Sequence, residues 1–89
     1  MKRNPDYLLR EVADTLVVVP VGAAANDFYG MITLNQTGAY LWELLRSEQT
    51  VQSLTEALMD EYAVEQEQAQ KDVEAFVNKL VSIGAILEN

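Results

Sequence analysis

Hydrophobic residues in the first third of the chain occur in short runs that are typical of β-strands. Residues 8–12 and 15–19 are aliphatic or β-branched, and the turn-like pair Ala13-Asp14 between them predicts a hairpin. A third strand is predicted over residues 28–34. Its alternating side chains are apolar on both faces, so one face should contact a core and the other needs a cover.

From residue 36 onward the apolar positions recur at helical spacing. Three helices are predicted, over residues 36–46, 51–62 and 65–83. Asn35 and Thr50 are N-cap residue types for the first two helices, and Gly84 suits the position after the end of the third. The predicted buried stripes are Gly38, Leu41, Trp42 and Leu45, then Val51, Leu54, Leu58 and Tyr62, then Ala69, Val73, Phe76, Val77 and Leu80.

The order of these elements predicts one α+β domain over residues 1–89. Three antiparallel strands followed by three helices are typical of the winged helix-turn-helix class. Residues 85–87 either add a short closing strand or pack against the core. The length of 89 residues fits one domain with a single modest core.

Composition narrows the possible partners and chemistry. The chain has 14 acidic and 6 basic side chains and a formal charge of −8, which disfavours nucleic acid and anionic membranes as partners. It contains no cysteine and no histidine, so disulfides, thiol nucleophiles, Ser-His pairs and ordinary zinc sites are excluded. We therefore expect no metal site and no cofactor.

The N-terminal segment MKRNPDYLLREV does not resemble a signal peptide, because charged residues interrupt its apolar positions. The longest apolar run, residues 16–25, contains Pro20 and Gly22 and is too short to span a bilayer. We therefore expect a soluble, cytoplasmic protein.

No group of residues indicates catalysis. The carboxylate pairs Asp60-Glu61 and Glu65-Glu67 lie on polar stretches around predicted helix ends, where no pocket is expected to shift a pKa. The glycines form no phosphate-binding loop, and no EF-hand spacing is present. We predict that the protein is not an enzyme and has no catalytic residues.

Three segments in order resemble the PqqD family: LNQTGAYLWELL at 34–45, TVQSLTEALMDEY at 50–62 and DVEAFVNKLVSIGAIL at 72–87. The resemblance covers about residues 8–87. It implies a recognition element that binds the leader of a ribosomally made precursor peptide and delivers it to a tailoring enzyme, often a radical S-adenosylmethionine protein. In that family the leader adds as a strand to the third β-strand, beside the third helix.

The residues themselves permit such strand addition. Residues 28–34 follow a hairpin and should form an edge strand with unpaired N–H and C=O groups. About five main-chain hydrogen bonds at roughly 1 kcal/mol each are largely offset by the cost of ordering a flexible peptide, about 2–5 kcal/mol. Apolar anchors must therefore supply most of the affinity. The predicted peptide-binding residues are Tyr29, Gly30, Met31, Ile32 and Thr33 on the strand and Asp72, Phe76, Lys79 and Leu80 on the helix.

These residues have different expected roles. Tyr29 and Met31 would be exposed on the second face of the strand unless something covers them. Phe76 and Leu80 also belong to the predicted core stripe, so they can serve as groove wall and core together. Asp72 and Lys79 would fix the register of the peptide through polar or charged side chains, although a solvated acid is the simplest account of Asp72. We assign Trp42 to packing and Asn35 to helix capping.

Two other functions use the same fold. A DNA-binding winged helix would need Lys and Arg on its third helix, but carboxylates outnumber Lys71 and Lys79 there, so the charge disfavours this alternative. A self-pairing oligomerisation module, in which the edge strand pairs with its copy in a homodimer, would use the residues of the predicted peptide site.

Overall fold

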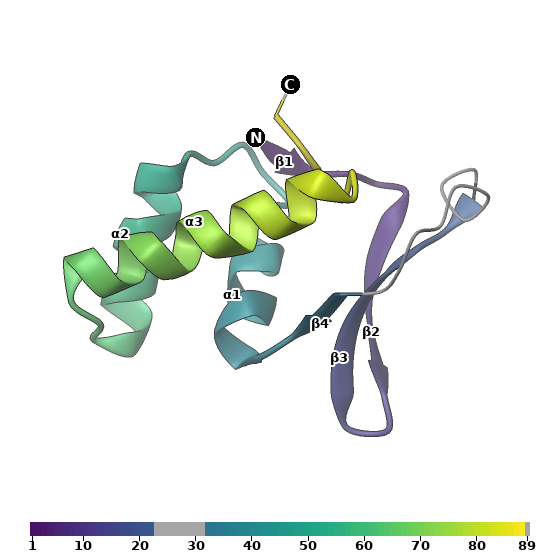
Figure 1. Cartoon of the computed structure of the whole chain (residues 1–89), viewed down its shortest axis with the longest axis horizontal. Helices are drawn as coiled ribbons and strands as arrows, with labels where there is room; N and C mark the ends of the chain where they lie inside the picture. Colours follow the sequence, from purple (N-terminus) through teal and green to yellow (C-terminus); the bar gives the residue numbers. More distant parts are fainter. Residues whose placement is uncertain (23–31, 89) are drawn as a thin grey trace.

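The computed structural model describes residues 1–22 and 32–88, which form two small antiparallel sheets and three helices (Figure 1). The larger sheet has the strand order β2-β3-β4. Its strands are β2 (Tyr7–Val12), β3 (Thr15–Pro20) and β4 (Ile32–Leu34), and the helices are α1 (Gln36–Leu44), α2 (Val51–Tyr62) and α3 (Gln66–Ser82). In the smaller sheet, β1 (Lys2–Arg3) pairs with β5 (Ile86–Leu87). The predicted fold class, a three-stranded antiparallel sheet followed by three helices, is confirmed.

The predicted hairpin is formed by β2 and β3. Their register runs from Val12 opposite Thr15 to Tyr7 opposite Pro20. The two turn residues have φ angles of 49° and 69°. A two-residue turn with both central φ angles positive matches the right-handed twist of the flanking strands, so the turn sets the register of the hairpin.

The third strand, β4, lies at the edge of the larger sheet. It pairs antiparallel with β3, with Ile32 opposite Val18 and Leu34 opposite Leu16. Ile32 and Leu34 are buried, whereas Thr33 between them is exposed. Residues 28–31 of the predicted strand lie outside the described residues.

Both predicted N-caps are confirmed. Asn35 Oδ1 accepts a hydrogen bond of 2.8 Å from the backbone N–H of Gly38 and so caps α1. Thr50 and Ser53 form a reciprocal capping box at the start of α2, with hydrogen bonds of 2.9 and 3.0 Å. These bonds satisfy backbone N–H groups that have no partner within the helix, so each helix begins at a defined residue.

Helix α3 ends as the sequence indicates. Gly84 has a φ of +83°, and the N–H of Ala85 donates to the carbonyl of Leu80 at 2.9 Å. This is the Schellman arrangement, for which glycine is favoured because it adopts the left-handed conformation without strain. It redirects the chain into β5, beside β1. The two-residue β1 is polar and was not predicted, because it shows no hydrophobic periodicity.

The core lies between the helices and the inner face of the larger sheet. Helix α2 packs along α3, α1 packs against α2, and β4 packs against α1. The core includes the predicted residues Leu41, Trp42, Leu45, Leu54, Leu58, Ala69, Val73, Val77 and Leu80. Within the described residues, no helix is long and apolar enough to cross a membrane.

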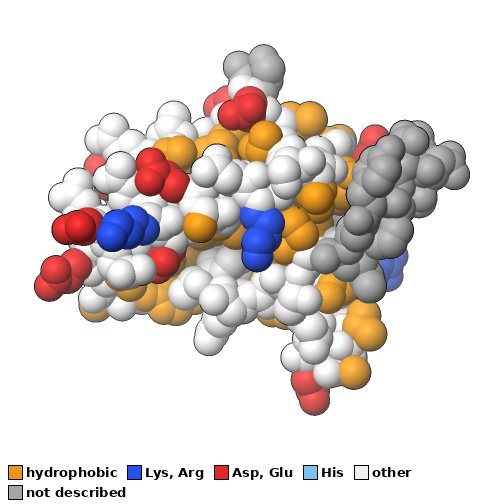
Figure 2. All heavy atoms as spheres, in the orientation of Figure 1, with side chains coloured by type: hydrophobic (Ala, Val, Ile, Leu, Met, Phe, Trp, Pro, Cys, Tyr) orange, Lys and Arg blue, Asp and Glu red, His pale blue; other side chains and the backbone are white. Residues whose placement is uncertain are grey.

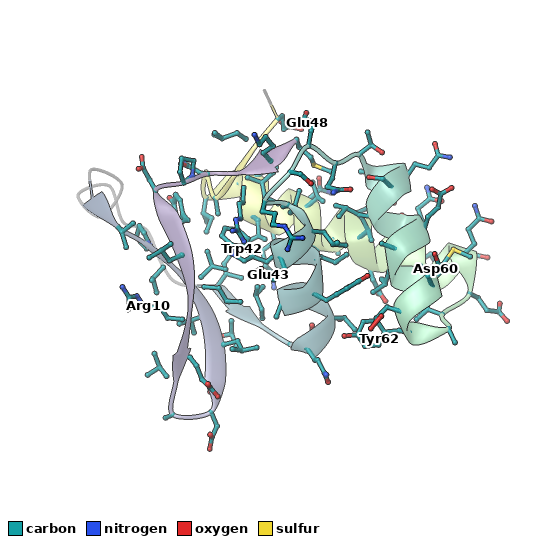
Figure 3. All side chains as sticks on the ribbon, turned by 180° about the vertical axis from the view of Figure 1, so that it is seen from behind. Arg10, Trp42, Glu43, Glu48, Asp60 and Tyr62 are labelled. Carbon is teal, nitrogen blue, oxygen red and sulfur yellow. The ribbon has the colours of Figure 1, made fainter. Side chains whose placement is uncertain are left out.

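Trp42 has the packing role that we assigned to it. Only 2% of its surface is exposed. The guanidinium carbon of Arg3 lies 5.8 Å from the centroid of the indole ring, which is within the range of a cation–π contact. In Figure 3, Trp42 lies within the body of the molecule, while Arg10 projects from the sheet away from the helices.

Candidate functional site

A groove of about 480 Å³ lies between β4 and α3. Strand β4, its continuation into α1 and one face of α3 form its walls, and α1 and α2 contribute apolar residues. The lining residues are Ile32, Thr33, Leu34, Asn35, Thr37, Gly38, Leu41, Leu58, Asp72, Ala75, Phe76, Lys79 and Leu80. Figure 2 shows apolar side chains exposed near the middle of this face of the molecule.

The strand wall presents backbone groups that have no partner among the described residues. The N–H of Val21 donates to the carbonyl of Asp6 at 2.7 Å, so Val21 points its backbone groups toward β2. Because these groups alternate along a strand, Val17 also points toward β2. Thr33, opposite Val17, therefore forms a non-hydrogen-bonded pair with it and directs its own N–H and C=O away from β3, toward the open edge.

The helix wall is one face of α3. Its lining residues are Asp72, Ala75, Phe76, Lys79 and Leu80, at spacings of three and four residues that place them on one side of a helix. Ala75 is exposed, so the wall is shallow between Asp72 and Lys79. This small side chain leaves space for a bulkier side chain of a ligand.

Phe76 and Leu80 connect the groove to the core. Phe76 is half-buried and packs against the core, while Leu80 is fully buried. Both line the groove. Leu80 therefore supports the groove from beneath, whereas Phe76 offers part of its ring to a ligand.

Gly38 permits the close approach of α1 to β4. A Cβ atom at this position would lie 3.3 Å from Asn35 Oδ1 and 3.4 Å from Leu34 Cβ. These distances are tight, so a larger side chain would push against the cap of α1 or against β4. Gly38 thereby helps to set the depth of the groove at this end.

The charges at the groove are few and exposed. Asp72 Oδ1 accepts a hydrogen bond of 2.9 Å from Gln68 Nε2. Lys79 takes part in none of the ion pairs found in residues 1–22 and 32–88. Both side chains are solvent-exposed and so remain available to a charged ligand.

The structure brings together every predicted site residue that it describes. Ile32, Thr33, Asp72, Phe76, Lys79 and Leu80 all line the same groove. The predicted site residues Tyr29, Gly30 and Met31 lie outside the described residues.

Several lining residues were not predicted as part of the site. Ala75 shares the helical face of Asp72 and Phe76, so helical spacing alone would have found it. Leu41 and Leu58 were predicted as core, and only the packing of three helices shows that they also reach the groove. Gly38 was predicted only as part of the buried stripe of the first helix, and Thr37 gave no signal beyond its place at the start of that helix.

An aromatic pair lies apart from the groove. The rings of Tyr40 and Tyr62 meet edge-to-face with centroids 5.7 Å apart. Burial raises the pKa of the Tyr40 hydroxyl, and the negative charges of Glu61, Tyr62 and Asp60 raise it further, in that order. Asp60 and Tyr62 lie at the same end of α2 (Figure 3). None of these four residues lines the groove.

Comparisons with known proteins point to one family and one fold. The family model described as "Coenzyme PQQ synthesis protein D (PqqD)" matches residues 10–86. The solved structure "TbiB1 in Complex with the TbiA(beta) Leader Peptide" is similar, with a TM-score of 0.75 at 18% identity over 100% of this chain and 98% of that chain. "Lasso peptide synthetase B1 complexed with the leader peptide" has a TM-score of 0.71 at 23% identity over 97% and 95%. No curated protein matches the chain.

Proposed function

The chain belongs to the PqqD family, and from this premise we propose that it binds the leader of a ribosomally synthesised precursor peptide. The leader would add as a strand to β4 and place alternate side chains against α3. The observation that supports this role most directly is the open backbone of Thr33 facing a groove with an apolar wall. The two structural neighbours are described as leader-peptide complexes, which agrees with the proposal.

Binding energetics favour a ligand with an apolar anchor. Each main-chain hydrogen bond contributes about 1 kcal/mol net, and ordering a flexible peptide costs about 2–5 kcal/mol. A dissociation constant near 1 μM requires about 8 kcal/mol. Burial of about 300 Å² of apolar surface at about 25 cal/mol per Å² would contribute roughly 7.5 kcal/mol. The side chains that the leader places against Phe76 and its neighbours must therefore supply most of the affinity.

The proposed role is that of an adaptor without catalytic residues. The carboxylate pairs Asp60-Glu61 and Glu65-Glu67 are exposed and do not line the groove. Chemistry on the peptide would then belong to a separate tailoring enzyme, to which this protein presents the leader. We expect that enzyme to contact the complex outside the groove, because the leader occupies the groove itself.

The test is a fluorescence anisotropy titration with the labelled N-terminal segments of short peptides encoded beside the gene. A scrambled peptide of the same composition is the control. Selective binding at micromolar concentrations is the expected result. If no neighbouring peptide binds better than its scrambled version, the proposed function is wrong.

Two controls separate this role from the alternatives that the fold allows. A homodimer formed through β4 would bury the groove, so light scattering should show a monomer that becomes a one-to-one complex on addition of peptide. Raising the salt concentration should change peptide affinity only mildly, since hydrogen bonds and apolar contacts dominate. A steep linear loss of log affinity with log salt would instead indicate nucleic-acid binding.

A further inference from the structure

We infer that the groove reads the order of charges along the peptide as well as its apolar anchor. The preferred segment has a basic side chain, an apolar side chain and an acidic side chain at positions i, i+2 and i+4, in the N-to-C direction. This inference rests on the proposed function, because it specifies the ligand of the same groove.

Two opposite charges mark the ends of the helix wall. Asp72 and Lys79 both line the groove and are seven residues apart on α3. Seven residues are two helical turns, which place their Cα atoms about 10.5 Å apart along the helix axis. Ala75 and Phe76 lie between them, so an apolar surface separates a negative end from a positive end.

Both charges are available to a ligand. Within the described part of the chain, Asp72 accepts a hydrogen bond from the neutral amide of Gln68, and neither Asp72 nor Lys79 forms an ion pair. Lys79 is thus an exposed lysine beside an apolar groove, without an ion-pair partner among the described residues, in a chain with a net charge of −8. A carboxylate supplied by the ligand would complement the charge of Lys79.

The directions of β4 and α3 set the direction of the peptide. In Figure 1, β4 runs toward α1, whereas α3 runs the opposite way, from the α2 side toward the sheet. Antiparallel pairing is slightly more stable per residue than parallel pairing. A peptide antiparallel to β4 follows the direction of α3, so its N-terminal part meets Asp72 and its C-terminal part meets Lys79.

Strand geometry sets the spacing of the three side chains. An extended chain advances about 3.4 Å per residue, and only every second side chain faces the helix. The Cα atoms of positions i and i+4 are then about 13.6 Å apart. Asp72 and Lys79 are about 10.5 Å apart along the axis of α3. The long side chains of the ligand and of Lys79 can bridge this difference. Position i+2 falls between them, opposite Ala75 and Phe76.

The test uses two synthetic peptides with identical composition and net charge. The first is Thr-Thr-Lys-Val-Leu-Val-Glu-Thr-Thr, and the second exchanges its lysine and glutamate. Amide NMR titrations measure the affinity of each peptide and show whether the resonances of β4 and α3 shift. We expect the first peptide to bind about tenfold more tightly, because the exchange replaces two attractive contacts with two repulsive ones.

A charge exchange in the protein provides the reciprocal test. The double variant Asp72→Lys with Lys79→Asp keeps the net charge and should reverse the preference between the two peptides. The control variant Lys71→Glu with Glu74→Lys exchanges charges on α3 outside the groove lining, and it should keep the original preference.

The outcomes separate this inference from the proposed function. Equal affinity of the two peptides, with shifts at β4 and α3, overturns the charge order but leaves leader binding in place. A preference that the groove variant does not reverse also overturns the inference. If neither peptide shifts the resonances of β4 and α3 and no leader binds in the anisotropy assay, the proposed function fails together with it.

Discussion

Thr33 lies directly opposite Val17 in the antiparallel pairing of β4 with β3. Because Val17 directs its backbone groups toward β2, the N–H and C=O of Thr33 point away from the sheet. This register therefore leaves the N–H and C=O of Thr33 at the edge of the groove without a partner among the described residues. The proposed strand addition at β4 would use this N–H and C=O.

Replacing Thr33 with proline tests the open edge. Proline removes the backbone N–H but leaves the β3–β4 ladder intact, because that N–H does not bond to β3. We expect leader affinity to fall about fivefold, which corresponds to the loss of one hydrogen bond worth about 1 kcal/mol. Anisotropy titration measures the affinity.

Thr33→Ala is the matched control, since it removes the same side chain and keeps the N–H. It should bind the leader nearly as well as the unmodified protein. Equal losses in both variants would show that the side chain, and not the backbone, contacts the peptide. Circular dichroism melts should show that both variants remain folded.

The raised pKa of Tyr40 predicts a change of stability in alkaline solution. The folded state holds the phenolic proton more tightly than the unfolded state, because burial and nearby carboxylates disfavour the charged form. This contribution is complete below the ordinary tyrosine pKa of about 10 and is lost as the pH rises through the higher pKa of the folded protein. The free energy of unfolding should therefore decrease above about pH 10.

Urea unfolding at a series of pH values measures this effect. Tyr40→Phe removes the ionisable group, so its unfolding free energy should fall less steeply in the same range. Tyr62→Phe is the comparison variant: it removes one smaller contribution to the raised pKa of Tyr40 but keeps the ionisable Tyr40, so it should retain most of the decrease. Equal slopes for the Tyr40→Phe variant and the unmodified protein would rule out Tyr40 as the source.

Local sequence signals predicted the helices and their ends well. Asn35, Thr50 and Gly84 each act through hydrogen bonds or backbone angles within a few residues of their own position. Such short-range interactions can be read from the sequence, because they do not depend on the rest of the fold. For the same reason the turn at Ala13 and Asp14 correctly predicted the hairpin.

Features that depend on distant segments were harder to predict. Strand β1 exists because Lys2 and Arg3 lie beside Leu87 and Ile86, and its polar residues show no strand pattern. Leu41 and Leu58 reach the groove only because α1 packs against α2 and α2 packs along α3. The helix wall could be predicted because it follows from the spacing of residues along α3. The positions of Leu41 and Leu58 in the groove could not, because they depend on the packing of three helices.

Leu80 should contribute more to stability than to peptide recognition. It is fully buried beneath the groove, so Leu80→Ala should reduce the free energy of unfolding by about 2–5 kcal/mol. The exposed groove residue Asp72 should behave differently, with Asp72→Asn changing stability by less than about 0.5 kcal/mol. Urea denaturation of both variants checks this prediction. A loss below about 1 kcal/mol for Leu80→Ala would show that the core does not depend on this residue.

Filling the groove at Ala75 should block the peptide while leaving the fold unchanged. Ala75 is exposed and lines the groove between the two charged ends of the helix wall, so a longer side chain there occupies the space that the apolar anchor needs. Lysine is a good helix former, and Ala75→Lys should change stability by less than about 0.5 kcal/mol. We expect leader affinity to fall at least about tenfold, or about 1.4 kcal/mol.

Asn78→Lys provides the matched control. It also adds a positive charge to an exposed position of α3, but Asn78 does not line the groove. Its affinity for the leader should stay within about twofold of the unmodified protein, a difference of roughly 0.4 kcal/mol. If the two lysine variants weaken binding equally, added charge on α3 is responsible and the peptide does not lie against Ala75. A loss confined to Ala75→Lys, with unchanged melting curves, would locate the apolar anchor between Asp72 and Lys79.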